Sequence, residues 1–368
     1  MASVYDAGIY AAWLHRQPGV SPMRLSRLIK TFGSAKTLYE QASAGALPVS
    51  DEFPPALFRT LCRNATESAL DETACSLQES GIRVLLSTDE NYPRLLSMLP
   101  SAPKVLYLRG RGKLSDLKYS VAFVGSRRCS NYGARVARRY AKALSERGVT
   151  IVSGMAFGID AASHAGALEG GAPLPTIAVL ASGVDVPSPV SNTPLYRSIL
   201  ERGLAVSEAA PGTQPVAGMY PVRNRIIAGL SQAVFVPEAS MGSGSWHTVN
   251  YADDYNREIL ACPGRVEDPL CAGSNEMLRL GATIVLSPDD LLSVFSFTEL
   301  PLQPEEKPAP VLSEEAHLVV DLLKKSDLSA DELFELVDLP MNRLLSLLTN
   351  LSSQGIIERT EYMKFHLL

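Results

Sequence analysis

The sequence contains no long hydrophobic run: no uninterrupted apolar stretch approaches ~18 residues, so no transmembrane helix is indicated. Its first residues, MASVYDAGIYAAWLH, lack the basic segment and the small-residue cleavage site of a secretory signal peptide. The five cysteines are odd in number and form no C-x-x-C pair, which argues against a disulfide framework and against zinc. With 46% hydrophobic and 20% charged residues in a chain of 368, the composition predicts a folded cytoplasmic protein of two or three domains with no membrane partner.

The signatures of common cofactors and metals are also missing. There is no G-x-G-x-x-G sequence and no phosphate-binding lysine of the Walker type, so neither a nicotinamide cofactor nor a nucleoside triphosphate is supported. His164 has no cysteine or histidine at a metal-ligand spacing, which favours a packed or surface histidine. No pairing of a nucleophile with a base, and no carboxylate pair, is recognisable. The sequence therefore predicts a binding protein with no cofactor, no metal and no catalytic residue.

Charge is unevenly distributed along the chain. The net charge is −5, and residues 311–368 carry ten acidic against five basic residues, so the rest of the chain is balanced. Between Val121 and Arg147 there are seven basic residues and one acidic residue, a local excess typical of a polyanion site. Four of these cations share one face of a predicted helix, which fits either a phosphate track or an ordinary solvated face. They are Arg135, Arg138, Arg139 and Lys142.

The middle of the chain, residues 80–297, alternates short apolar strands with helices. The strand-like runs are SVAFVGS, TIVSG, TIAVLASG, LAVSE, QAVFVPEA, EILACPG and ATIVLSP, each of which ends in small or turn residues. Apolar strands separated by helices form βαβ units on a sheet that is buried on both faces. This pattern predicts an α/β domain with a doubly wound, Rossmann-like and mostly parallel sheet, which binds ligands at the carboxyl ends of its strands.

Two smaller modules are predicted to flank this domain. Residues 1–75 read as short helices that resemble a SAM-like or helix-hairpin-helix module, with Ser21 and Ser34 as N-caps and Gly33 ending the helix between them. Residues 298–311, TELPLQPEEKPAPV, predict a stiff proline-rich linker. Residues 312–368 are predicted to form three helices and then two short strands, the order of a winged-helix module.

Glycine, serine and arginine recur where the predicted strands end. Three loops have small residues that let a phosphate approach backbone N–H groups, and the segment YPVRNRIIAGLS places two arginines near the start of a helix. Because all of these loops follow strands of one sheet, we expect them to converge on one phosphate-binding pocket. Asp160 is expected to cap its own helix. The candidate residues are Gly125, Ser126, Arg127, Arg128, Ser153, Gly154, Gly158, Arg223, Asn224, Arg225, Ser243, Gly244 and Ser245.

Six motifs, in a constant order, together resemble the DNA processing protein A (DprA, also called Smf) family. They are VAFVGSRRCSNYG, IVSGMAFGIDAASHAGAL, TIAVLASGVD, YPVRNRIIAGLSQAVFVPEA, SGS and PGRVEDPLCAGSNEMLRLGA. The resemblance implies a single-stranded DNA-binding protein that helps to load a RecA-type recombinase during natural transformation, with the candidate residues above around the DNA backbone. The family commonly has a tyrosine-proline and a lysine where this chain has Ser188-Pro189 and Thr193, so one cation is missing from that side of the pocket.

Two other functions compete with this interpretation. Nucleotide phosphoribohydrolases have a similar sheet, but Tyr251 stands where their loop carries a glutamate. A regulator that binds duplex DNA through the winged helix is the second alternative. Its candidate recognition helix offers only Arg343 as a cation, whereas duplex binders usually neutralise several phosphates.

The end of the sheet domain, SNEMLRLGATIVLS, gathers apolar side chains. Packing against the sheet would explain some of them. The resemblance implies that this end forms a homodimer, and two linked pockets would bind a long strand more tightly through effective concentration. The predicted interface residues are Met277, Leu278, Leu280 and Ile284.

Overall fold

The computed structural model describes residues 5–48, 53–295, 313–324, 326–337, 339–353, 357–359 and 364–367. The chain divides into two compact units, Met1–Leu302 and Gln303–Leu368, and each is described by itself below. The predicted linker, residues 298–311, lies outside the described residues. No helix in the described ranges combines the length and the apolar character that crossing a bilayer requires.

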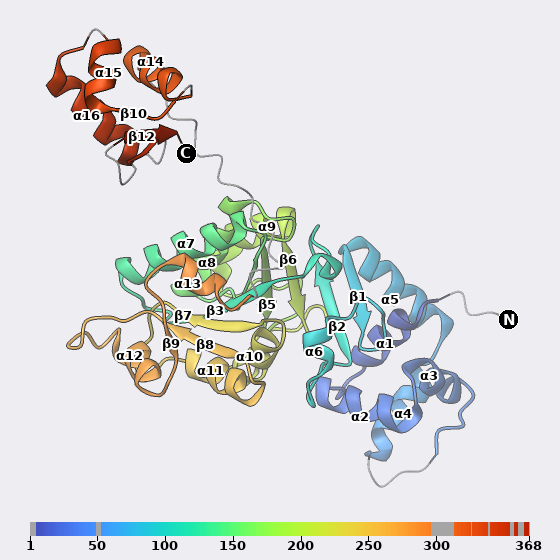
Figure 1. Ribbon diagram of the computed structural model, residues 1–368. Helices are drawn as coiled ribbons and strands as arrows, with labels where there is room; N and C mark the ends of the chain where they lie inside the picture. Colours follow the sequence, from blue (N-terminus) through green and yellow to red (C-terminus); the bar gives the residue numbers. More distant parts are fainter. Residues whose placement is uncertain are drawn as a thin grey trace. The chain divides into compact units, whose positions relative to one another are not determined.

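A nine-stranded sheet forms the centre of the first unit, in the order β1-β2-β6-β5-β4-β3-β7-β8-β9 (Figure 1). Strands β3 to β9 pair in parallel, whereas β2 is antiparallel to both of its neighbours. The predicted strands and the mostly parallel sheet are confirmed, and β1 and β2 extend its edge. The strands are β1 (Ile82–Leu86), β2 (Val105–Arg109), β3 (Ser120–Phe123), β4 (Thr150–Ser153), β5 (Thr176–Leu180), β6 (Leu204–Ser207), β7 (Ala233–Val236), β8 (Glu258–Ala261) and β9 (Thr283–Ile284).

Helices cover both faces of the sheet, because its central strands are apolar on each side. Helices α7, α8 and α9 lie on one face, and α10, α11 and α12 lie on the other (Figure 1). Their bounds are α6 (Arg94–Ser97), α7 (Asn131–Glu146), α8 (Ile159–Gly170), α9 (Thr193–Arg202), α10 (Met219–Gly229), α11 (Ser245–Asp254), α12 (Ala272–Arg279) and α13 (Pro288–Leu292). Two 3-10 turns, η1 (Leu114–Asp116) and η2 (Val190–Asn192), complete this part.

The N-terminal helices share a core with the sheet rather than forming one of their own. The apolar cluster that contains Trp13 also contains Tyr107 of β2 and Ala205 of β6. The predicted caps are present: the Ser21 and Ser34 side chains accept hydrogen bonds from the first turns of their helices, and Gly33 has a positive φ of 78°. These helices are α1 (Ala7–His15), α2 (Pro22–Phe32), α3 (Ala35–Ser43), α4 (Pro55–Asn64) and α5 (Glu67–Glu79).

Two buried histidines are expected to make the first unit less stable in acid. The Nδ1 atom of His15 lies 3.1 Å from the Tyr107 hydroxyl, and that of His164 lies 2.6 Å from Thr176 Oγ1. Burial lowers the pKa of His15 to about 4 and that of His164 to about 3. In this pH range the two histidines bind protons in the unfolded chain but stay neutral in the folded chain. We therefore expect the free energy of unfolding to fall as the pH drops from about 6.5 to about 4.

For each histidine the expected slope is at most about 1.4 kcal/mol per pH unit. Urea unfolding at pH 7 and pH 5 measures it. His15→Asn should show a smaller pH dependence than the unmodified chain. The exposed His247 offers a control, since H247N should keep the full dependence. Equal slopes for the unmodified chain and H15N would contradict the prediction.

The second unit contains three helices and a small antiparallel sheet in the order β10-β12-β11. The three helices and two of the strands agree with the sequence analysis, and the short strand β10 adds a third to the sheet. Its core is apolar, with Val319, Leu333 and Leu344 fully buried. The elements are α14 (Glu314–Leu323), β10 (Leu328–Ser329), α15 (Ala330–Leu336), α16 (Met341–Ser353), β11 (Ile357–Arg359) and β12 (Lys364–Leu367).

Candidate functional site

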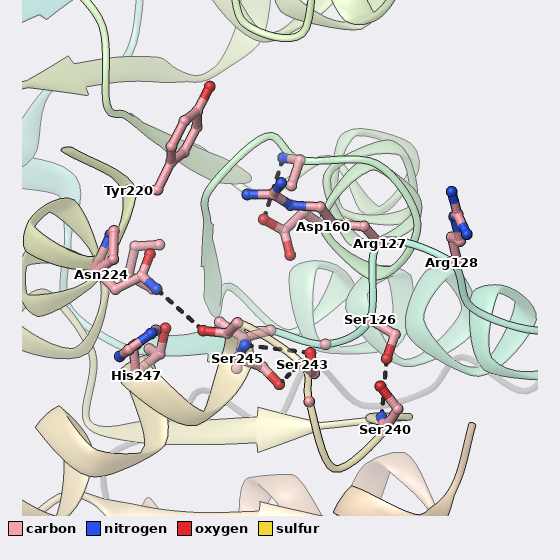
Figure 2. Close-up of a pocket in the computed structure, with 18 of the residues that line it drawn as sticks. Ser126, Arg127, Arg128, Asp160, Tyr220, Asn224, Ser240, Ser243, Ser245 and His247 are labelled. Carbon is pink, nitrogen blue, oxygen red and sulfur yellow. Dashed lines mark hydrogen bonds between the residues drawn. The ribbon is translucent and has the colours of Figure 1, made fainter. Parts of the chain in front are cut away.

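The carboxyl ends of β3, β4 and β7 surround a pocket of about 660 Å³ (Figure 2). Its walls come from the loops after these three strands and from the first turns of α10 and α11. The strands are neighbours in the sheet order β4-β3-β7, so loops far apart in the sequence become adjacent here. The structure thus brings the three small-residue loops together at one edge of the sheet, as predicted.

The loop between β3 and α7 provides the exposed cations of the pocket. A Cβ on Gly125 would lie 2.5 Å from Ile159 Cγ1 and 2.6 Å from the Glu238 carbonyl oxygen, so only glycine fits there. Ser126 donates its N–H to that carbonyl, and its Oγ accepts a 3.0 Å hydrogen bond from the Ser240 N–H. These bonds fix the loop, and Arg127 and Arg128 project from it into solvent. The residues of this loop that line the cavity are Val124, Gly125, Ser126, Arg127 and Arg128.

Arg127 is positioned by an aromatic ring that the sequence analysis did not single out. Its guanidinium carbon lies 5.2 Å from the centroid of the Tyr220 ring, a cation–π arrangement. The Tyr220 hydroxyl lies 3.1 Å from Ser188 Oγ, within the loop that lacks the family's tyrosine-proline and lysine. In Figure 2 the Arg127 side chain extends into the pocket, and Arg128, which also lines the pocket, points away from the Arg127 side chain. Both arginines are exposed, and the Tyr220 ring holds Arg127 in place.

The loop between β4 and α8 supports the pocket instead of offering amides to an anion. The Asp160 carboxylate accepts hydrogen bonds of 3.2 Å from the N–H groups of Gly154 and Ala156, so those donors are already occupied. Asp160 thus secures the preceding loop rather than capping α8, whose N-cap is Gly158. Ser153 is fully buried and donates to the Phe123 carbonyl oxygen at 2.7 Å. Neither Ser153 nor Gly154 lines the cavity.

Gly158 brings this loop against the cationic one. Its φ is +72°, and a Cβ there would lie 2.4 Å from the Ser126 carbonyl oxygen and 2.7 Å from that of Arg127. A side chain would therefore push the two loops apart. Gly158 acts on the pocket through the position of Arg127, and it does not line the cavity itself.

Arg223 lies in the floor of the pocket, and only 7% of its surface is exposed. Its guanidinium donates to the carbonyl oxygens of Gly154, at 2.8 Å, and Val179. Burial lowers its pKa to about 10, against the opposing effect of Asp160. Burial raises the pKa of Asp160, and the Arg223 charge opposes that shift. The two charges compensate each other below the pocket, so the expectation of an open phosphate contact at Arg223 is corrected.

Arg225 points to the other side of α10 and does not line the cavity. It forms an ion pair with Glu208 and donates to the Ser101 carbonyl oxygen at 2.6 Å. The sequence analysis placed both arginines at a helix start, but α10 begins earlier, at Met219. Residues two positions apart on an α-helix are separated by about 200° around the axis, so Arg225 points away from this cavity while Arg223 stays in its floor.

The start of α11 forms the opposite wall of the pocket. The N-cap, Gly244, gives no side-chain hydrogen bond, and the Ser245 hydroxyl donates to Ser243 Oγ at 2.9 Å. The Asn224 side chain reaches across from α10 to the Gly244 carbonyl oxygen at 3.5 Å (Figure 2). A helix start of this kind favours an anion. His247, one turn further along, is a further exposed lining residue that the sequence analysis missed.

Charges around the pocket favour an anion in the open part and neutrality in the floor. Among the described residues that line it, Asp160 is the only acid, and it is buried beside Arg223. Tyr251, at the position of the phosphoribohydrolase glutamate, packs on Tyr255 with ring centroids 5.9 Å apart. The described residues also contain no group of three or more His, Cys, Asp or Glu side chains that could hold a metal ion.

The predicted interface residues separate into two groups. Met277 is only 2% exposed and belongs to the apolar core beneath the sheet, so it is corrected to a core residue. Leu278 is partly buried against the same core. Leu280 and Ile284 are 64% and 52% exposed, and Ile284 lies on the edge strand β9. An apolar surface therefore remains at this end of the sheet, but it is smaller than predicted.

Comparisons with known proteins agree with the fold and the pocket motifs. The profile of the DNA recombination-mediator protein A family matches residues 83–296. Protein Smf of Synechocystis is 34% identical over 291 residues, which cover 78% of this chain and 72% of the relative. DNA processing protein DprA of Streptococcus pneumoniae is 42% identical over 210 residues, which cover 57% of this chain and 73% of the relative.

Two solved structures are similar as well. The X-ray structure of DprA from Streptococcus pneumoniae has a TM-score of 0.65 at 33% identity and covers 78% of this chain and 98% of its own. DNA processing protein A from Helicobacter pylori, whose structure was described for its single-stranded DNA binding mode, has a TM-score of 0.52 at 30% identity and covers 58% and 94%. Because the matched residues include the sheet from β3 to β9 and every loop of the pocket, this chain belongs to the DNA recombination-mediator protein A (DprA/Smf) family.

Proposed function

We propose that the pocket binds the phosphate backbone of single-stranded DNA and that the protein presents the bound strand to a RecA-type recombinase during natural transformation. The observation that carries this proposal is the pair of exposed guanidiniums, Arg127 and Arg128, in one pocket with the N-terminal end of α11. The single-stranded DNA binding described for the Helicobacter pylori relative supports it. The family's role as a recombination mediator supports the handover to a recombinase.

The shape of the site favours a single strand over a duplex. The cations lie around a pocket rather than along a flat surface. A flexible single strand can bend so that one of its phosphates enters this pocket. Contacts of this type fix the position of a strand without reading its sequence. We therefore propose that binding is independent of sequence.

The first test is the salt dependence of binding. Because each phosphate contact releases counterions, we expect the affinity for a single-stranded oligonucleotide to fall steeply between about 50 and 200 mM salt. A duplex of the same sequence should bind more weakly throughout. Gel-shift or fluorescence-anisotropy titrations at several salt concentrations measure both effects. An affinity that does not change with salt would contradict phosphate as the main contact.

A duplex-binding role for the C-terminal unit has less support. Its helix and strand order fits a winged-helix module, but Arg343, on the candidate recognition helix, pairs with Glu315 at 3.1 Å. Residues 311–368 also carry a net charge of −5. We propose a protein-contact role for this unit.

We also propose a homodimer through the exposed apolar residues near β9. Replacing Leu280 and Ile284 together by glutamate should produce a monomer, because like charges would then face each other across the interface. Long strands should bind this variant more weakly, since the two pockets no longer act together, whereas short oligonucleotides should bind almost normally. Light scattering and titrations with both lengths measure this. A monomer mass for the unmodified protein at micromolar concentration would contradict the proposal.

A further inference from the structure

A second pocket, of about 520 Å³, lies on the other side of α10 from the first. It is bordered by the start of α2, by residues 100–104, by the ends of β5 and β6, and by α10. The first pocket occupies the carboxyl ends of β4, β3 and β7, and the sheet order continues from β4 through β5 to β6. The two pockets are therefore consecutive along one edge of the sheet. Arg223 of α10 lines both of them.

The second pocket combines apolar walls with a polar floor. Its apolar lining includes Met219 and Val222 of α10 and Pro22 and Met23 of α2. Thioether and aliphatic side chains of this kind adapt to flat apolar surfaces. Its polar lining includes the ion pair between Glu208 and Arg225, whose side chains are only 13% and 12% exposed.

Such a pocket matches the chemistry of a nucleobase. A base has two apolar faces and a polar edge, so its faces would pack on the Met219 and Val222 side while its edge meets the Glu208–Arg225 pair. Lys104, exposed at the rim, is placed to contact a neighbouring phosphate. An entirely apolar ligand would make no hydrogen bond to the Glu208–Arg225 pair and would gain nothing from Lys104.

We infer that this second pocket holds a base of the same single strand whose phosphate occupies the first pocket. The inference rests on the proposed function. An α-helix with its side chains is about 10 Å across, so a short stretch of extended strand can cross the N-terminal half of α10 and reach both pockets. The second pocket adds affinity that depends on the presence of bases, whereas the first pocket adds affinity that depends on charge.

The experiment compares two strands of equal length and charge: an oligo-dT and a fully abasic oligomer. We expect the unmodified full-length protein to bind the dT strand about tenfold more tightly, because burying a base is favourable. The test variant is Met219→Ser/Val222→Ser, which removes apolar wall from the second pocket only. Its matched control is Met98→Ser/Val266→Ser, since these side chains are exposed and line neither pocket.

The variant should lose most of the preference for dT and keep the affinity for the abasic strand, while the control keeps both. Three results would overturn the inference: no preference in the unmodified protein, an unchanged preference in the variant, or an equal loss for both strands. If the variant kept the preference for dT, the second pocket would instead be a site for an apolar protein segment. Failure of the proposed function looks different, because then neither strand binds in a salt-dependent way. Circular dichroism confirms that both variants are folded.

Discussion

Replacing Arg127 and Arg128 together by alanine is expected to lower the affinity for single-stranded DNA on the order of 100-fold, because two charge-assisted contacts to phosphate are lost. Both guanidiniums are exposed and neither forms an ion pair among the described residues, so their removal should leave the fold intact. Fluorescence anisotropy at low salt measures the affinity. The slope of log affinity against log salt should become shallower by about one for each lost contact.

A matched control uses two arginines from the exposed face of α7. Arg135→Ala/Arg139→Ala removes the same charge without touching the pocket lining. This variant should lose only a small part of the affinity, through the weaker general field. If it lost as much as R127A/R128A, the face of α7 would be a phosphate track, and the pocket would not be the main site.

Replacing Arg223 by methionine is expected to destabilise the first unit by about 3–5 kcal/mol, since Asp160 would remain buried without its compensating charge. The carbonyl oxygens of Gly154 and Val179 would lose their donor as well. Urea unfolding, followed by circular dichroism, measures the loss. Arg279, which is exposed and pairs with Glu276 on its own helix, provides the control, and R279M should change the stability by less than about 1 kcal/mol.

A second substitution separates the charge effect from general damage to the core. Arg223→Met/Asp160→Asn removes both charges, so it should recover part of the stability lost in R223M. A double variant less stable than R223M by the full cost of D160N would show that the two side chains act independently. R223M with the stability of the unmodified protein would show that Arg223 does not compensate Asp160.

Local features of the chain were predictable because they depend on neighbours in the sequence. Ser21 and Ser34 cap helices through bonds to residues three positions ahead, and Gly33 ends a helix through its own backbone. The apolar runs of β3 to β9 needed only hydrophobicity and length to be recognised. The carboxyl-edge location of the pocket then follows from parallel pairing, without any knowledge of side-chain positions.

The roles of individual side chains depended on contacts that the sequence does not contain. Arg223 and Arg225 look equivalent in the sequence, but the start of α10 at Met219 sends one into the pocket floor and the other toward Glu208. Gly218, the N-cap, has no side chain to mark that start. Tyr220 was missed because its partner, Arg127, lies in a loop far away in the sequence.

The central strands β3 to β9, the helices between them and the edge of the sheet where the small-residue loops meet were all predictable from the sequence. Which residues of a segment face solvent depended on the packing between elements. Met277 belongs to the core and Leu280 to the surface, although both stand in one apolar segment. Asp160 holds a loop instead of capping its helix. Burial is a property of packing between elements, and a pattern along one chain segment cannot specify what another segment covers.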